Sequence, residues 1–141
     1  MLPAPPVEPV PGLVASLRFR GDGPRGAAQL VGRLREATAL LSTYPGFIDA
    51  RVGRAIDDGT LVSLDLAWDT VGSYRRALSS YDVKLQVVPL LSQAIDGPTA
   101  FETLHLRDRG GAIDATGALA ADAGSVSLGS AAAGFVPPAP S

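Results

Sequence analysis

The chain has 141 residues, 46% of them hydrophobic and 18% charged, and its mean hydropathy of +0.21 is typical of one soluble globular domain with additional terminal segments. Twelve Lys and Arg residues against fourteen Asp and Glu residues give a formal net charge of -2, so there is no cationic excess with which to bind nucleic acid phosphates. The lack of cysteine and the single histidine, His105, exclude disulfides, thiolate nucleophiles and thiolate or histidine-rich metal sites.

Three segments of the chain differ in composition. Residues 1–11 hold five of the twelve prolines, which favours an extended arm. Residues 12–107 have the patterning of a folded domain, and residues 108–141 are dominated by Ala, Gly, Ser and Pro, which predicts a disordered tail. No segment has the pattern of a signal peptide or the roughly 18 apolar residues of a membrane span. We therefore expect a cytoplasmic protein with no membrane partner.

The first two predicted elements are a strand and a long helix. Residues 13–19 alternate between apolar and polar side chains, which predicts a strand with one apolar face. Asp22 is a candidate helix N-cap, and Pro24 suits the first helical turn. Apolar residues then recur at spacings of three and four as far as Leu41, so we predict an amphipathic helix that ends before Pro45.

Residues 48–56 and 62–68 have the alternation of two strands joined as a hairpin by Asp57-Asp58-Gly59. A three-residue loop with Gly59 in the left-handed conformation would place the apolar residues of both strands on one face. The predicted partners are Ile56 with Thr60, Val52 with Leu64, Ala50 with Leu66, and Ile48 with Trp68. The same register places Arg51 opposite Asp65, where we expect an ion pair.

The second half of the domain contains further helices and a last strand. Asp69 is a candidate N-cap for a helix with one apolar stripe, formed by Val71, Tyr74, Leu78 and Tyr81. Residues 83–95 are helical in pattern but contain Pro89, which predicts a kink or two short helices. Residues 100–106 complete the order strand, helix, strand, strand, helix, strand. This order predicts a ferredoxin-like α+β fold, a four-stranded antiparallel sheet with both helices on one face.

Three short motifs occur in an informative order: Pro45-Gly46-Phe47 before the second strand, Trp68-Asp69 at the end of the third, and Ser73-Tyr74-Arg75 in the following helix. In this order, they resemble the antibiotic biosynthesis monooxygenase group of the dimeric α+β barrel superfamily, over about residues 13–105. The resemblance implies a homodimer whose two sheets pack as a barrel. It also implies, for some members, oxidation of electron-rich aromatic polyketides without metal or flavin.

Some of the site residues of these monooxygenases have a match in this chain, and others do not. Trp68 and Tyr74 match a tryptophan and a tyrosine that line the substrate pocket of the polyketide-oxidising members. Those members also have an asparagine and an arginine where this chain has Leu64 and, by approximate alignment, Val88. The haem-degrading members need an asparagine where this chain has Leu17, and a histidine where it has Val87 or Val88, so haem degradation is excluded.

Cofactor-free oxygenation needs an apolar slot, a stacking surface and one or two polar groups near a ring oxygen of the substrate. We expect such a pocket between sheet and helices, with Trp68 and Tyr74 as the catalytic residues and with no metal or cofactor. Its expected walls are Leu17, Phe19, Leu64, Leu66 and Trp68, with the hydroxyls of Tyr74 and Tyr81 at its mouth. An unperturbed tyrosine titrates near pH 10, so Tyr74 would orient a phenol rather than deprotonate it.

The leading hypothesis is a cofactor-independent monooxygenase that acts on an aromatic polyketide or a quinol-type molecule. The alternatives are a polyketide cyclase and a non-catalytic module for dimerisation or ligand binding. Trp68 and Tyr74 would equally suit an ordinary core, and His105 would act as a base only if it reached the pocket. On the other face of the sheet, Arg18, Arg51 and Asp65 are expected to form a polar network that a second subunit covers.

Overall fold

The computed structural model of the chain describes residues 11–115. The helices and strands follow one another in the expected order, with one additional hairpin at the end. They are β1 (Leu13–Arg20), α1 (Gly23–Leu41), β2 (Phe47–Arg54), β3 (Leu61–Trp68), α2 (Val71–Ser79), α3 (Tyr81–Gln86), α4 (Val88–Leu91), β4 (Ala100–Glu102), β5 (His105–Asp108) and β6 (Gly111–Asp114).

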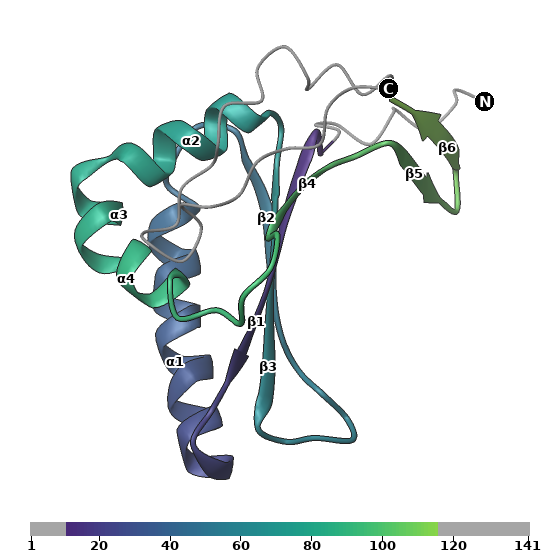
Figure 1. Cartoon of the computed structure of the whole chain (residues 1–141). Helices are drawn as coiled ribbons and strands as arrows, with labels where there is room; N and C mark the ends of the chain where they lie inside the picture. The colour runs from purple at the N-terminus through teal and green to yellow at the C-terminus, as the bar shows by residue number, and fades with distance from the viewer. Residues whose placement is uncertain (1–10, 116–141) are drawn as a thin grey trace.

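The first four strands form one antiparallel sheet in the order β2-β3-β1-β4. β1 lies in the interior of the sheet and pairs with β3 over all eight of its residues, from Leu13 opposite Trp68 to Arg20 opposite Leu61. The helices α1 to α4 all lie on one face of this sheet (Figure 1). The predicted ferredoxin-like arrangement is confirmed.

The core lies between this face of the sheet and the helices. Alternate residues of β1 are buried, and so is the predicted stripe of α1. Complete burial of one large aliphatic side chain contributes about 1.5 to 3 kcal/mol, so this contact outweighs the weak intrinsic preference of any one helix. The buried side chains of these two elements are Leu13, Ala15, Leu17, Phe19, Ala27, Leu30, Leu34, Ala37 and Leu41.

The hairpin register is confirmed in the middle of the two strands, whereas both of its ends differ from the prediction. Val52 lies opposite Leu64, and Ala50 lies opposite Leu66. At the start of β2, a bulge between Phe47 and Asp49 places Phe47, not Ile48, opposite Trp68. One extra residue in a strand shifts the pairing by one position, which the alternation alone does not reveal.

The turn of the hairpin is also longer than predicted. The last strand pair joins Arg54 to Val62, and the predicted pair of Ile56 with Thr60 is not formed. Gly59 does not have a positive φ, so the predicted left-handed glycine turn is wrong. The loop is instead organised by the carboxylate of Asp58, which accepts hydrogen bonds from the backbone N–H and the hydroxyl of Thr60 and from Arg20 of β1.

The second helical region consists of three short helices. Thr70, not the predicted Asp69, is the N-cap of α2, and its hydroxyl oxygen accepts a 3.0 Å hydrogen bond from the N–H of Ser73. The chain becomes extended at Ser80 before α3 begins. Pro89 lies in the first turn of α4, so the predicted break into short helices is confirmed.

The end of the described chain differs from the single predicted strand over residues 100–106. β4 is only three residues long, and β5 pairs with β6 in a separate hairpin that stands apart from the main sheet (Figure 1). β6 lies within residues 108–115, which we assigned to the tail. Residues 1–10 and 116–141, with the rest of the predicted arm and tail, lie outside the described residues. No helix within residues 11–115 is long and apolar enough to cross a membrane.

We predict that Asp58 contributes to stability in a pH-dependent way. Hydrogen bonds from Thr60 and then Arg20 lower the pKa of Asp58 from 3.8 to about 2. Because the folded-state pKa is depressed, this stabilisation is present above pH 3.8 and is lost as the pH falls towards 2. Urea unfolding should show that Asp58→Asn lowers the free energy of unfolding at pH 6, and that the difference from wild type disappears near pH 2.

The matched control is Asp57→Asn, because Asp57 makes no side-chain hydrogen bond within residues 11–115. It should change stability less than Asp58→Asn at pH 6. Equal effects of the two variants at both pH values would show that the Asp58 contacts do not stabilise the loop.

Candidate functional site

Trp68 and Tyr74 meet in the core at the end of the sheet. Trp68 is the last residue of β3, and Tyr74 faces it from α2, with their ring centroids 5.7 Å apart and their planes at 40°. Phe47 contacts Trp68 edge to face from β2, at 5.3 Å and 89°. Both Trp68 and Tyr74 are 0% exposed. The bulge that displaces Ile48 is therefore what brings an aromatic ring against the indole.

The structure places six of the seven predicted site residues in one buried cluster. Four of them lie on the inner face of β1 and β3 and are at most 1% exposed, namely Leu17, Phe19, Leu64 and Leu66; Trp68 and Tyr74 complete the set. Tyr81 is the exception, because it is 76% exposed. The prediction placed Tyr81 on the same helix as Tyr74, whereas the extended residue Ser80 separates the two helices and turns Tyr81 to the surface.

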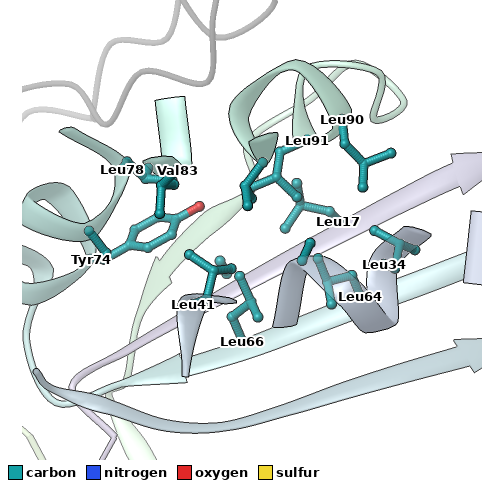
Figure 2. Packing of buried hydrophobic residues seen from close by; sticks show 14 of the residues in the cluster. Leu17, Leu34, Leu41, Leu64, Leu66, Tyr74, Leu78, Val83, Leu90 and Leu91 are labelled. Carbon is teal, nitrogen blue, oxygen red and sulfur yellow. The ribbon is translucent and has the colours of Figure 1, made fainter. Parts of the chain in front are cut away.

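The packing around Tyr74 is closed, contrary to the pocket mouth that we predicted. Its ring lies beside Leu78 and Val83, and its hydroxyl points into the cluster towards the side on which Leu91 lies (Figure 2). These three aliphatic residues are all 5% exposed or less. α3 and α4 provide this cover: α3 contacts α1 and α2, and Val83 of α3 and Leu91 of α4 are fully buried.

Two polar atoms in this apolar environment have no hydrogen-bond partner within the described residues: Nε1 of Trp68 and the hydroxyl oxygen of Tyr74. A buried polar group without a partner costs about 1 to 3 kcal/mol, and native structures contain few of them. Burial raises the pKa of the Tyr74 hydroxyl well above its ordinary range. Both groups are therefore protonated at neutral pH and can act as hydrogen-bond donors, and Tyr74 is not a general base.

A polar cluster at the start of α2 lies next to Trp68 and Tyr74 in the sequence, and it was not predicted. Ser73 is 4% exposed, and its hydroxyl oxygen accepts a hydrogen bond of 3.3 Å from Arg76. Gly46 has a φ of +92°, and a Cβ atom at this position would overlap Ser73 and Asp69. The N–H of Asp69 donates a 2.9 Å bond to the carbonyl of Gly46, which ties β2 to the residue after Trp68. The Pro45-Gly46-Phe47 motif was the signal that could have identified this contact.

His105 does not belong to the aromatic cluster. It lies on β5, where its Nδ1 atom is 2.6 Å from a carboxylate oxygen of Asp114, and its side chain is 47% exposed. It is therefore not positioned as a base for a substrate beside Trp68. Within residues 11–115, no group of three His, Cys, Asp or Glu side chains could hold a metal ion.

A hollow of about 120 Å³ opens between α1 and the α3–α4 segment, and none of the predicted site residues lines it. Apolar side chains form part of it, and three polar side chains, Arg33, Glu36 and Gln86, complete the lining. Ala37, Val87 and Leu90 line this hollow and also belong to the core cluster that contains Tyr74, and Leu40 packs against that cluster. The hollow therefore borders the core at the contact between α1 and the α3–α4 segment.

The predicted polar network on the other face of the sheet is not formed. Arg51 and Asp65 are register partners, as predicted, but within residues 11–115 neither of them makes an ion pair, and Arg18 makes none either. Arg18 and Arg51 are exposed, and Asp65 is half-buried. The long arginine side chains are exposed because no second layer formed by residues 11–115 covers this face.

Comparison with known proteins supports the fold assignment. No family model matches the chain, and no curated protein matches it. Among solved structures, SnoaB, a cofactor-independent oxygenase from Streptomyces nogalater, is 19% identical with a TM-score of 0.56, and the match covers 67% of this chain and 94% of SnoaB.

Two further structures show the same similarity. The monooxygenase ActVA-Orf6 of Streptomyces coelicolor, solved with nanaomycin D, is 24% identical with a TM-score of 0.53, and the match covers 66% of this chain and 88% of that chain. A Deinococcus radiodurans protein, assigned provisionally to antibiotic biosynthesis monooxygenases, is 18% identical with a TM-score of 0.54, over 64% and 91% of the two chains. The chain has the fold of the antibiotic biosynthesis monooxygenases, as the motifs led us to expect.

We predict that Gly46→Ala destabilises the protein by about 2 to 4 kcal/mol, because alanine is strained at a positive φ and its methyl group would displace Ser73 and Asp69. Gly32→Ala is the matched control, since Gly32 is exposed within α1 and has open space around it. It should stabilise the protein by about 0.5 to 1 kcal/mol. Chemical unfolding measures both, and a neutral Gly46→Ala would contradict the close contact between β2 and α2.

Proposed function

We propose that the chain is a small cofactor-independent monooxygenase that binds an aromatic polyketide or a quinol-type molecule between its sheet and helices, against Trp68 and Tyr74. The observation that carries this proposal is a pair of buried donors, Trp68 Nε1–H and the Tyr74 hydroxyl, that have no hydrogen-bond partner among residues 11–115. A ligand oxygen would satisfy both, and the aliphatic surroundings suit the rest of an aromatic ring system. The similarity to SnoaB and ActVA-Orf6 supports the same class of activity.

The proposed reaction needs little from the protein because the substrate supplies the electrons. An activated CH₂ group of an anthrone-type substrate loses a proton to water, and the resulting carbanion transfers one electron to O₂. The carbon radical and superoxide combine to a peroxide anion, which takes back a proton from water. The hydroperoxide then loses water and leaves a ketone. Donors at the neighbouring substrate oxygen stabilise the enolate form of that carbanion and so lower the pKa of the bound substrate.

Binding requires the closed core to open. The covering segment is divided into helices of nine, six and four residues, with breaks at Ser80 and Val87. Helices this short depend on tertiary packing, and not on their own hydrogen bonds, for their stability. We propose that movement of α3 and α4 away from α1, starting at the hollow between these segments, admits the ligand.

A non-catalytic module is the second candidate, and a specific observation favours it. Trp68 and Tyr74 are completely buried. Leu64 and Val88 occupy the positions where the resemblance implies an asparagine and an arginine in the polyketide-oxidising proteins. If the chain is a non-catalytic module, Trp68 and Tyr74 serve only to pack the core. The ligand-binding test below separates the two candidates.

We also propose that the protein is a homodimer formed through the open face of the sheet. Apart from Arg20, which pairs with Asp58, this face carries two cations, Arg18 and Arg51, and two anions, Asp49 and Asp65, and none of these four is ion-paired within the described residues. A charged surface that packs against its own copy around a two-fold axis must be self-complementary, so it needs both signs of charge. The balance of charges on this face meets that requirement.

The test of the proposed activity is oxygen uptake with a panel of anthrones and quinols. The wild-type protein should consume oxygen above the buffer rate, and Tyr74→Phe should lower this rate about 10- to 1000-fold, because it removes one donor to the developing anion. Tyr81→Phe removes a hydroxyl from an exposed ring and should leave the rate unchanged. Tyr74→Phe should also keep or raise the free energy of unfolding, by up to about 1 kcal/mol, because the lost hydroxyl has no partner.

No uptake above buffer, with the fluorescence of the single tryptophan unchanged across the panel, would reject the enzyme and leave the module. Equal losses of rate in Tyr74→Phe and Tyr81→Phe would contradict the assignment of the buried hydroxyl.

A further inference from the structure

We propose that the hollow between α1 and the α3–α4 segment is a binding site for a small aliphatic α-amino acid, of the size of valine or leucine. This site is separate from the aromatic cluster and does not depend on the proposed activity. The observations are the size of the hollow, its apolar floor, and two opposite charges in its lining that have no partner within residues 11–115.

One face of α1 forms the first wall of the hollow. Arg33, Glu36, Ala37 and Leu40 all line it, because residues three, four and seven apart lie on the same side of a helix. Ala37 has the only short side chain in this row, and it is buried. The space is therefore left where a single methyl group lies between longer side chains.

The second wall is the junction of α3 and α4. Gln86 is the last residue of α3, Val87 lies between the two helices, and Leu90 belongs to α4. Val87 and Leu90 are buried, so they present only a small apolar surface to the hollow. Together with Ala37 and Leu40 of α1, they form an apolar floor beneath the exposed polar side chains.

The volume of the hollow suits a short aliphatic side chain. It measures about 120 Å³, and an apolar cavity of about 150 Å³ accommodates benzene. The hollow therefore has room for about three or four carbon atoms, with the polar end of the ligand at its open side. A polycyclic molecule, such as the substrate proposed for the aromatic cluster, is too large for it.

Two opposite charges suit the polar end of an amino acid. Arg33 and Glu36 are both exposed, and neither makes an ion pair or a side-chain hydrogen bond within residues 11–115. A direct pair in which the cation precedes the anion has the less favourable orientation on a helix. A guanidinium binds a carboxylate through two parallel hydrogen bonds, and a carboxylate binds an ammonium group. An α-amino acid carries both groups on one carbon atom, so it can contact Arg33 and Glu36 together.

A ligand with one charge fits this lining less well than a zwitterion. A carboxylate bound to Arg33 would bring its negative charge close to Glu36, and an amine bound to Glu36 would bring its positive charge close to Arg33. Like charges at such distances repel each other. The lining therefore favours a ligand that carries one charge of each sign.

Isothermal titration calorimetry of the full chain with leucine tests the site. Leucine should bind with a Kd of about 0.1 to 1 mM, as expected for so small a ligand. Glycine, which lacks the side chain, should bind at least about tenfold more weakly. Arg33→Gln should raise the Kd for leucine at least about fivefold, because it removes the partner of the carboxylate.

Arg35→Gln is the matched control, since Arg35 is an exposed arginine of the same helix that does not line the hollow. It should change the Kd less than about twofold. No heat of binding up to about 20 mM leucine, or equal losses of affinity in the two variants, would overturn the site.

Two analogues of leucine separate the roles of the charges. 4-Methylpentanoate lacks the ammonium group, and it should bind the wild-type chain at least about fivefold more weakly than leucine. Glu36→Gln should remove this difference, and Arg33→Gln should likewise remove the difference between leucine and 3-methylbutylamine, which lacks the carboxylate. Equal binding of leucine and 4-methylpentanoate to the wild-type chain would show a site for anions alone and would overturn the proposed ligand.

The ¹H–¹⁵N spectrum locates the bound ligand. Leucine should shift the backbone amide resonances of Val87 and Leu90 and leave the indole resonance of Trp68, the one tryptophan of the chain, in place. A shift of the indole resonance with none at Val87 and Leu90 would place leucine in the aromatic cluster and overturn the separate site. Oxygen uptake with anthrones and quinols decides the proposed activity independently, so failure of one proposal is distinguishable from failure of the other.

Discussion

The packing of α1 against the paired strands β1 and β3 is the contact on which the rest of the structure depends. β1 and β3 pair over eight residues, and their inner faces supply the large aliphatic side chains that α1 covers. This pairing places Trp68 at the edge of the core, and the chain then enters α2 directly, so that Tyr74 faces the indole. The candidate site is therefore a consequence of the sheet register and not of a specialised loop.

Periodicity was sufficient to predict the faces of the strands and helices, and the order of these elements predicted the fold. The hairpin illustrates why: Val52 lies opposite Leu64, and a shift of one residue in this register would bury Asp65 or expose leucine, whichever turn joins the strands. The turn itself was not predictable in this way, since it depends on the contact of Asp58 with Arg20, 38 residues away in sequence. The bulge at Phe47 likewise depends on tertiary packing.

The site was predicted in composition more accurately than in shape. The apolar alternation and the motifs identified six residues that do lie together, whereas Tyr81 was assigned to a helix that in fact ends at Ser79. A stripe of apolar residues cannot show a break at Ser80 when the next helix continues the same pattern. The closed packing around Tyr74 depends on how α3 and α4 fold back, and the two donors without partners become visible only when all of these elements are placed.

The most direct test of the central claim, that Trp68 and Tyr74 hold a hydrogen-bonding ligand, is the nuclear magnetic resonance signal of the indole N–H. The chain has one tryptophan, so its ¹H–¹⁵N spectrum contains a single indole resonance. Addition of an anthrone or a quinol should move this resonance downfield and slow its exchange with solvent deuterium, and Tyr74→Phe should weaken the binding. An indole resonance that stays in place at saturating ligand, while other resonances shift, would show that ligands bind elsewhere and that the two rings belong to an ordinary core.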